Sequence, residues 1–252
     1  MRTVVIQSHR QPLPYDWLHP CIESVRHWAA AQGYEYMWLG DELFDGLNDT
    51  QRRHTQRQPV VASDLGRLQH LNNELARGAD RVVWCDADTL VINPGTLELT
   101  ETGCALGREI WIQPGTTIDG TPKVYSKVHN AFMVFCQDDS FLPFYLDTAS
   151  RLLQRHKGPY VDQFIGPKLL TALHNIAQLR VMENAGVLSP GVVTDLNGGG
   201  GVFLDAYCRR LQRVPAALNL CASSVRSGEL SEQSMHNVVE TLQAHGTSLF
   251  TS

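Results

Sequence analysis

Several features that define protein classes are absent from this chain. No two of its six cysteines form a Cys-x-x-Cys pair, which argues against a zinc knuckle or a thiol redox motif. No run of 18 apolar residues occurs, so no transmembrane helix is expected. The first residues contain only a short apolar run, which is too short for a secretory signal. Lys and Arg form no cluster and the formal net charge is −5, so a nucleic-acid partner is not expected.

The composition is that of an ordinary folded protein. The 252 residues are 43% hydrophobic, which is enough apolar surface to offset the entropy cost of ordering the chain. Neither an internal repeat nor a low-complexity linker divides them, so we expect a single domain over residues 1–252. Free thiols and the missing signal predict a cytoplasmic location, with peripheral association with a membrane left open.

The first hundred residues show the pattern of a βαβ unit. A β-branched run over 3–7 and a run over 35–39 predict strands, and helical spacing over 21–32 predicts the helix between them. The polar stretch 45–59 is expected to be a loop. Strand, helix and strand at this spacing predict a parallel sheet.

A leucine-rich helix is predicted next, with Ser63 as its N-cap and Gly78 closing it. Leucines at helical spacing form its buried stripe. At about 100° per residue, Asp64 falls within that stripe and Arg67 at its edge. A buried carboxylate is costly unless something pairs with it. An i,i+3 ion pair between these two residues is therefore the plain structural interpretation.

The rest of the chain predicts two more apolar strands, a loop with short strands between them to about Thr117, and a mainly helical C-terminal part. The expected elements are a strand over 81–85, a strand over 131–136, and helices over 140–156, from Gly166-Pro167 to about 174, over 204–213 and over 231–244. The glycine run at 197–201 is expected to lie in a loop.

The strongest chemical signal is the sequence VVWCDADTLVINP, from Val82 to Pro94. An apolar strand ends abruptly at Asp86 and Asp88, and open α/β sheets bind ligands at the carboxyl ends of their strands. Two carboxylates this close repel each other, and Mg²⁺ or Mn²⁺ bound to oxygen ligands would relieve that repulsion. We therefore predict Asp86 and Asp88 as metal ligands, against the alternative of two solvated loop aspartates.

The segment VASDLGRLQHLNNELARGADRVVWCDADTLVINP resembles glycosyltransferase family 32, the DXD sugar-binding group with the GT-A fold. Ser63, Asp64 and Arg67 match the Ser-Asp-x-x-Arg helix that precedes the DXD strand in that family. The sequence departs from the family at 78–82, where Gly-Ala-Asp-Arg-Val replaces the usual Gly-Gly-x-Tyr pattern. The resemblance implies that Asp64 and Arg67 contact donor sugar hydroxyls, that Asp86 lies near the ribose and the metal, and that Asp88 ligates the metal directly.

Two weaker resemblances add candidate residues. In HNAFMVF, Asn130 resembles the Asn of related transferases that reaches the bound sugar, although it could simply cap a strand end. In GPYVDQFIGPKLLTAL, Asp162 and Gln163 resemble the Asp-Gln pair of the retaining transferases of family 8. That resemblance implies catalytic roles, with Asp162 bonding a donor hydroxyl and Gln163 stabilising charge at the anomeric carbon. The alternative is a polar pair that enters a helix.

A third metal ligand from the C-terminal region is expected by resemblance. His245, followed by Gly-Thr-Ser-Leu, partly matches the family's His and Ser-Trp pattern, but it could equally be a lone surface histidine. Asn219 and Ser223 are rival oxygen ligands. The sequence does not separate these three.

Together these observations predict a GT-A-like, Rossmann-related α/β fold with a mixed sheet flanked by helices. Residues 1–125 would bind the nucleotide sugar, and residues 126–252 would cover the acceptor site. By resemblance the chain moves a hexose from a UDP- or GDP-linked donor to a glycan, lipid-linked or protein acceptor, using Mn²⁺ or Mg²⁺ and retaining the anomeric configuration.

The alternatives are a HAD-like phosphatase that uses Asp86 and Asp88, and a degenerate protein that binds nucleotide sugar without turnover. A sugar-1-phosphate nucleotidylyltransferase is disfavoured, because the loop after the first strand contains no glycine.

Overall fold

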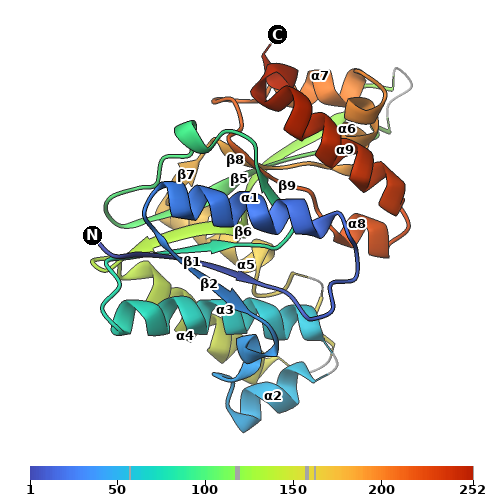
Figure 1. The fold of residues 1–252 in the computed structure, drawn as a ribbon. Helices are drawn as coiled ribbons and strands as arrows, with labels where there is room; N and C mark the ends of the chain where they lie inside the picture. The colour runs from blue at the N-terminus through green and yellow to red at the C-terminus, as the bar shows by residue number, and fades with distance from the viewer. Residues whose placement is uncertain (57, 117–119, 157–158, 162, 252) are drawn as a thin grey trace.

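The structure of the chain, a computed structural model, describes residues 1–252 except 57, 117–119, 157–158, 162 and 252 (Figure 1). The helices are α1 Leu18–Ala31, α2 Asp49–Thr55, α3 Pro59–Ala76, α4 Phe141–Arg155, α5 Pro167–Ala177, α6 Pro190–Asn197, α7 Val202–Cys208, α8 Ser223–Arg226 and α9 Glu232–His245. The strands are β1 Thr3–Ser8, β2 Glu35–Leu39, β3 Arg81–Cys85, β4 Thr89–Val91, β5 Cys104–Gln113, β6 Lys123–Cys136, β7 Arg180–Met182, β8 Ala185–Val187 and β9 Ala217–Asn219.

The main sheet has the strand order β2-β1-β3-β6-β5-β7. Strands β2, β1 and β3 are parallel neighbours, whereas β6 runs antiparallel to both β3 and β5. A second, small sheet has the order β4-β9-β8, and β4 begins directly after the turn that follows β3. The mixed α/β sheet flanked by helices that the sequence predicts is therefore confirmed.

Successive side chains of β1 and β3 point to opposite faces of the sheet, and apolar residues at consecutive positions bury both faces. On one face, Val4 and Val82 pack with α3, α4 and α5; on the other, Val5 and Val83 pack with α1. Figure 1 shows the same layering, with α1 on one side of the sheet and α3 and α4 on the opposite side. A sheet covered on both faces leaves the ends of its strands as the accessible places for chemistry.

The C-terminal part packs on the small sheet instead. Helices α6, α7 and α9 share one apolar cluster with the first turns of α1 and with β9 (Figure 1). Asp195, near the end of α6, accepts hydrogen bonds from the backbone N–H groups of Phe203 and Leu204, at 2.7 and 2.9 Å. The glycine run between these helices is thus a structural turn in which a carboxylate caps α7.

Among the described residues, no helix combines the length and apolar character needed to cross a bilayer.

Two expectations for the N-terminal half are wrong. The stretch 45–59 contains helix α2, which begins in a capping box: Asn48 accepts from the N–H of Gln51, and the Gln51 side chain accepts from the N–H of Asn48. Helix α3 begins at Pro59 rather than after Ser63, because proline at the first position starts a helix well. Ser63 lies inside the helix, where its hydroxyl donates to the carbonyl of Pro59 at 2.9 Å.

The C-terminal part contains more strand than expected. Strands β7, β8 and β9 were not predicted, because three-residue strands are too short to show periodicity. Helix α6 was not predicted either. Helix α7 ends at Cys208, short of the predicted end at Arg213. Strand β6 starts at Lys123, because its polar first half pairs with β5 outside the core.

Candidate active site

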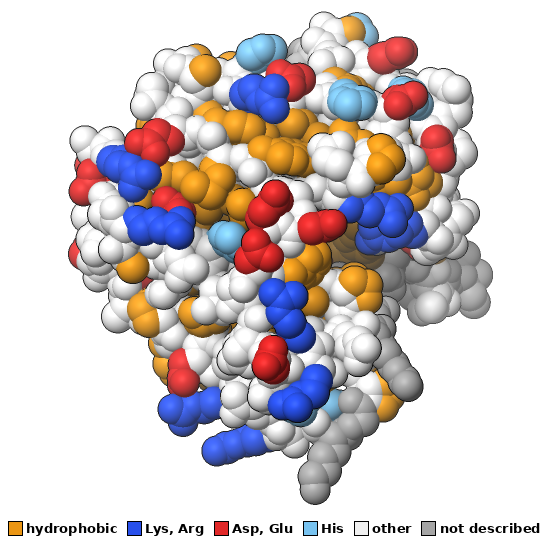
Figure 2. Space-filling view, turned by 60° about the horizontal axis from the view of Figure 1, so that its bottom comes forward, with side chains coloured by type: hydrophobic (Ala, Val, Ile, Leu, Met, Phe, Trp, Pro, Cys, Tyr) orange, Lys and Arg blue, Asp and Glu red, His pale blue; other side chains and the backbone are white. Residues whose placement is uncertain are grey.

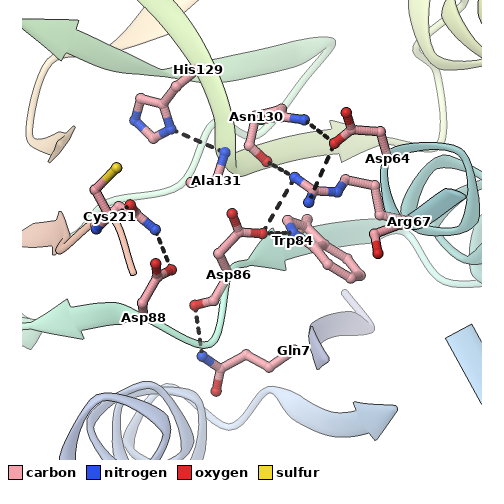
Figure 3. Close-up of polar contacts among 12 residues, drawn as sticks. Gln7, Asp64, Arg67, Trp84, Asp86, Asp88, His129, Asn130, Ala131 and Cys221 are labelled. Atoms are coloured by element: carbon pink, nitrogen blue, oxygen red, sulfur yellow. Dashed lines mark hydrogen bonds and ion pairs between the residues drawn. The ribbon is translucent and has the colours of Figure 1, made fainter. Parts of the chain in front are cut away.

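Four predicted residues, Asp64, Arg67, Asp86 and Asn130, meet at the carboxyl ends of β1 and β3 (Figure 3). Asp86 directly follows β3, and its backbone N–H continues the ladder by donating to the carbonyl of Ala131 at 2.8 Å. Because β6 is antiparallel to β3, the residues just before that point on β6, including Asn130, lie at the same edge. Gln7, near the end of β1, donates to the Asp86 carbonyl at 3.1 Å.

Arg67 is the centre of the arrangement. It is 8% exposed, and its Nη1 donates to the Asn130 carbonyl at 2.8 Å. It forms ion pairs with Asp86 at 3.3 Å and with Asp64 at 3.5 Å. Its guanidinium lies 5.0 Å from the centre of the Trp84 ring, whose Nε1 donates to Asp86 at 2.6 Å. The i,i+3 pair expected from the sequence is thus present, as one part of a larger network.

Asp64 is buried, as its place on the apolar stripe of α3 predicts. Its Oδ1 accepts from the Asn130 amide at 2.8 Å, and within the described part of the chain its Oδ2 is buried without a hydrogen-bond partner. Burial raises the pKa of Asp64 to about 6, although Arg67 and the Asn130 amide act in the opposite direction. Asn130 lies within β6, so the alternative that it caps a strand end is wrong, and its amide belongs to the network. A donor-binding role for these residues stays a prediction.

Asp88 is held from the other side, by the small sheet. The Asn219 amide donates to its Oδ1 at 2.5 Å, and the N–H of Ala222 donates to its Oδ2 at 2.7 Å. Burial, followed by the charge of Asp86, raises the pKa of Asp88 to about 6. Both contacts come from neutral groups, so no cationic side chain of the described residues pairs with this carboxylate.

The two aspartates offer suitable ligands for a hard divalent cation. The Asp86 side chain is 27% exposed, and within the described residues its Oδ2 has no hydrogen-bond donor. Carboxylate oxygens are preferred by Mg²⁺ and Mn²⁺, and Mg²⁺ is commonly held by one or two carboxylates together with substrate phosphates and water. The mutual repulsion that contributes to the raised pKa of Asp88 is the cost that such a cation would remove.

The described part of the chain does not single out a third protein ligand. Among the described residues, no three His, Cys, Asp or Glu side chains gather as a metal site. His245 ends α9, and the neighbouring Gly246 lies beside the carbonyl of Ile92, just beyond β4. Asn219 already uses its amide on Asp88 and its oxygen on the N–H of Cys221. The Ser223 hydroxyl lies 3.1 Å from the Cys221 sulfur.

Cationic side chains flank the two aspartates. His9 and Arg10 follow β1, and the fields of Arg10, Arg226 and Asp86 all act on the His9 ring, whose pKa is lowered first by burial. Arg226 ends α8, one turn after the Ala222 N–H that contacts Asp88. Figure 2 shows acidic side chains gathered near the middle of one face, with basic and histidine side chains beside them. Nothing in the sequence marked these cations in advance.

The Gly166-Pro167 helix start reaches this network. A β-carbon on Gly166 would lie 2.5 Å from Asp64 Oδ2 and 2.8 Å from the Asn130 amide nitrogen, so the backbone packs directly on both side chains. Gln163 is exposed in the preceding turn with a positive φ of 61°. Asp162 lies outside the described residues. The predicted catalytic roles of Asp162 and Gln163 therefore stay predictions.

Trp84 and Gln7 are functional candidates that the sequence analysis missed. Both contact Asp86, Trp84 at its carboxylate and Gln7 at its backbone carbonyl. The usable signal was Trp84 itself, two residues before Asp86, because residues i and i+2 of an extended chain point to the same side. Gln7 is fully buried, and the Tyr36 hydroxyl donates to its side-chain oxygen at 2.9 Å.

The comparisons with known proteins give distant likenesses. No family model and no curated protein matches the sequence. A solved glycosyltransferase involved in glycosylation of the major capsid of PBCV-1 is 11% identical, with a TM-score of 0.48, over 94% of this chain and 99% of that chain. Mannose-1-phosphate geranyltransferase from Thermus thermophilus is 12% identical, with a TM-score of 0.31, over 62% of this chain and 66% of that chain. Likenesses this distant carry no argument about function, which has to come from the site.

Proposed function

We propose that the chain is a GT-A-type glycosyltransferase that transfers a hexose from a UDP- or GDP-linked donor, with Mn²⁺ or Mg²⁺ held between Asp86 and Asp88. The observation that supports this most directly is the unequal treatment of the two aspartates. Arg67 pairs with Asp86, whereas Asp88 has only neutral donors among the described residues and a raised pKa. A carboxylate without a protein counter-charge, at the carboxyl edge of a sheet, suits a cation that arrives with a substrate.

The surrounding charges suit the rest of such a substrate. A diphosphate is a strong anion, and Arg10 and Arg226 carry no ion pair with any described carboxylate. They lie on the two segments that hold Asp86 and Asp88, one after β1 and one on α8. We assign them to the phosphate oxygens, because guanidinium groups match phosphate in charge and geometry.

The other residues would orient the donor and its acceptor. Arg67 and Trp84 fix the Asp86 carboxylate, and Asn219 fixes that of Asp88, so the ligands are preorganised before substrate arrives. A bound cation would supply electrostatic stabilisation of the leaving diphosphate. Asp64 and Asn130 would read donor hydroxyls, and Gln163 would stabilise charge near the anomeric carbon with retention of configuration. A glycan, a lipid-linked glycan or a protein could be the acceptor.

A screen for slow hydrolysis of nucleotide sugars tests the proposal without an acceptor. We expect release of UDP or GDP with Mn²⁺ or Mg²⁺, and none in EDTA. Asp147→Asn is a suitable control, because the Asp147 side chain is 57% exposed on α4 and pairs with Arg151, away from the site. Tight binding without any release would instead favour a degenerate binding protein. Cleavage of simple phosphomonoesters, with an aspartyl-phosphate formed, would favour the phosphatase alternative.

The phosphate assignment has its own measurement. Arg10→Gln and Arg226→Gln should each weaken binding of UDP or GDP by about 3- to 10-fold at low salt, while leaving the bare nucleoside nearly unaffected. Arg53→Gln, at an exposed arginine on α2, controls for a general change in net charge. Equal losses for the nucleoside and the diphosphate would remove these two residues from the phosphate site.

A further inference from the structure

Strand β6 leaves its neighbour β5 at one place along their described pairing. Leu106 pairs with Met133, but the next residue, Gly107, pairs with His129, so residues 130–132 of β6 have no partner on β5. On its other side β6 stays paired, because the Asp86 N–H donates to the carbonyl of Ala131. The result is a bulge beside the candidate site, and bulges commonly re-aim side chains next to active sites.

The His129 ring spans this bulge. Its Nδ1 accepts from the N–H of Ala131 at 3.1 Å, so the proton must sit on Nε2, which donates to the carbonyl of Ala185 at 3.2 Å. The ring occupies the space beside Gly107, where any β-carbon would collide with it. His129 is 3% exposed, and both of its nitrogens are used.

Each contact of the ring leads to one of the two aspartates. Ala131 donates its N–H to Nδ1, and its carbonyl accepts the N–H of Asp86. Ala185 begins β8, which pairs with β9, and Asn219 at the end of β9 donates to Asp88. A single imidazole therefore joins the main sheet, which carries Asp86, to the small sheet that positions Asp88.

We infer that His129 is a positioning residue for the Asp86-x-Asp88 centre, acting through the backbone of Ala131 on the placement of Asp86. This inference rests on the proposed function, since it concerns the placement of the same two carboxylates. It assigns no contact between His129 and substrate. The ring accepts from one buried N–H and donates to one buried carbonyl, and the first of these bonds fixes the backbone at the site.

Two substitutions separate these two contacts. An Asn side chain places an amide oxygen near the position of Nδ1, so His129→Asn keeps an acceptor for Ala131 and loses the donor to Ala185. A Gln side chain reaches the position of Nε2, so His129→Gln keeps the donor and leaves the Ala131 N–H unsatisfied. Each variant loses one buried hydrogen bond, so their losses of thermal stability should be similar.

The measurement is nucleotide-sugar hydrolysis with Mn²⁺, with kcat and KM determined separately and folding checked by near-UV circular dichroism. We expect His129→Asn to keep kcat within about threefold of wild type. We expect His129→Gln to lower kcat by about 10- to 100-fold with KM changed less than about threefold, as for a misplaced catalytic group. His70→Asn is the control, because His70 also contacts one carbonyl, that of Glu42, on the α3 surface away from the two aspartates.

The outcomes distinguish the inference from the proposal beneath it. If the two variants have equal kcat values, His129 has no positioning role, whether both values stay near wild type or both fall along with stability. That result leaves the proposed function intact. If His129→Gln does not fold, Gly107→Ala tests the positioning role of His129 instead. Its β-carbon displaces the imidazole ring without removing either nitrogen. A wild-type kcat in folded Gly107→Ala would overturn that role. A wild-type protein that neither binds nor hydrolyses any nucleotide sugar with Mn²⁺ overturns the proposed function, and the inference with it.

Discussion

The two aspartates of one motif, separated by a single residue, are held by different sheets and in different electrical surroundings. Asp86 ends a strand of the main sheet, where Arg67 supplies a counter-charge and Trp84 a neutral donor. Asp88 is held by the small sheet through the neutral groups of Asn219 and Ala222. Within the described chain, the protein therefore supplies a cationic partner to the first carboxylate, one that Asp86 shares with Asp64, and supplies none to the second.

The difference distinguishes a charge that stabilises the fold from a charge that is available to a ligand. An ion pair between buried groups mainly removes a desolvation cost that folding created, and losing one partner is expensive. A preorganised but uncompensated carboxylate instead lowers stability, which proteins tolerate where a ligand later supplies the charge. Arg67 should therefore matter most for folding and Asp88 most for activity.

The largest effect is expected at Asp88. Asp88→Asn keeps the shape of the side chain but removes the charge that would hold a cation. We expect cation-dependent turnover to fall by about 1,000-fold, equivalent to about 4 kcal/mol of transition-state stabilisation. The free energy of unfolding should change by less than about 2 kcal/mol, because relief of the repulsion from Asp86 offsets the loss of one of the two hydrogen bonds that the carboxylate accepts. Turnover close to wild type would show that the cation binds elsewhere.

At Arg67 we expect the opposite: a large loss of stability is the main effect of substitution. Arg67→Gln leaves the carboxylates of Asp64 and Asp86 without a cationic partner, and Asp64 is buried. Denaturant unfolding should show a loss of about 3–5 kcal/mol. The control is Arg151→Gln on α4, where the arginine side chain is 65% exposed, and its loss should stay below about 0.5 kcal/mol. A cost for Arg67→Gln as small as the control would contradict a structural role for the network.

Gly166, at the start of α5, packs against the Asp64 side of the same network. A β-carbon at this position would lie so close to Asp64 and Asn130 that Gly166→Ala must displace the start of α5 or the network itself. We expect a loss of about 1–3 kcal/mol in unfolding free energy. Gly95→Ala is the matched control, because its β-carbon would meet Asn93 at an ordinary 3.6 Å. Similar results for the two variants would mean that the α5 start is not packed as described.

The smallest expected effect is a difference between wild type and Asp88→Asn in how the free energy of unfolding depends on pH. With its pKa raised to about 6, Asp88 takes up a proton in the folded protein as the pH falls through about 6, whereas in the unfolded chain it stays ionised until the pH is about two units lower. In EDTA, wild type should therefore gain stability relative to Asp88→Asn as the pH falls from about 7.5 to about 5, by about 1–2 kcal/mol. Urea unfolding at both pH values checks this. Parallel pH profiles would show that Asp88 has a counter-charge after all.

The sequence predicted the elements whose signal is local and strong. The apolar run ending at Asp86 predicted β3 with the bounds observed, and helical spacing put Asp64 on the buried side of α3. Helix α2 was missed because its start depends on a capping box between Asn48 and Gln51 rather than on apolar periodicity. Strands β7 to β9 were missed because a strand of three residues takes its conformation from the strands it pairs with.

The sequence alone identified the candidate groups: a carboxylate pair after a buried strand, and an acidic and a basic residue one turn apart on a helix. Only the tertiary structure decided which of them are paired. Arg67 meets Asp86 because α3 packs on the face of the sheet that presents Trp84. Asn219 meets Asp88 from 131 residues away, because β9 pairs with β4. Contacts of that separation are fixed by strand pairing and packing, which leave no pattern in either segment alone.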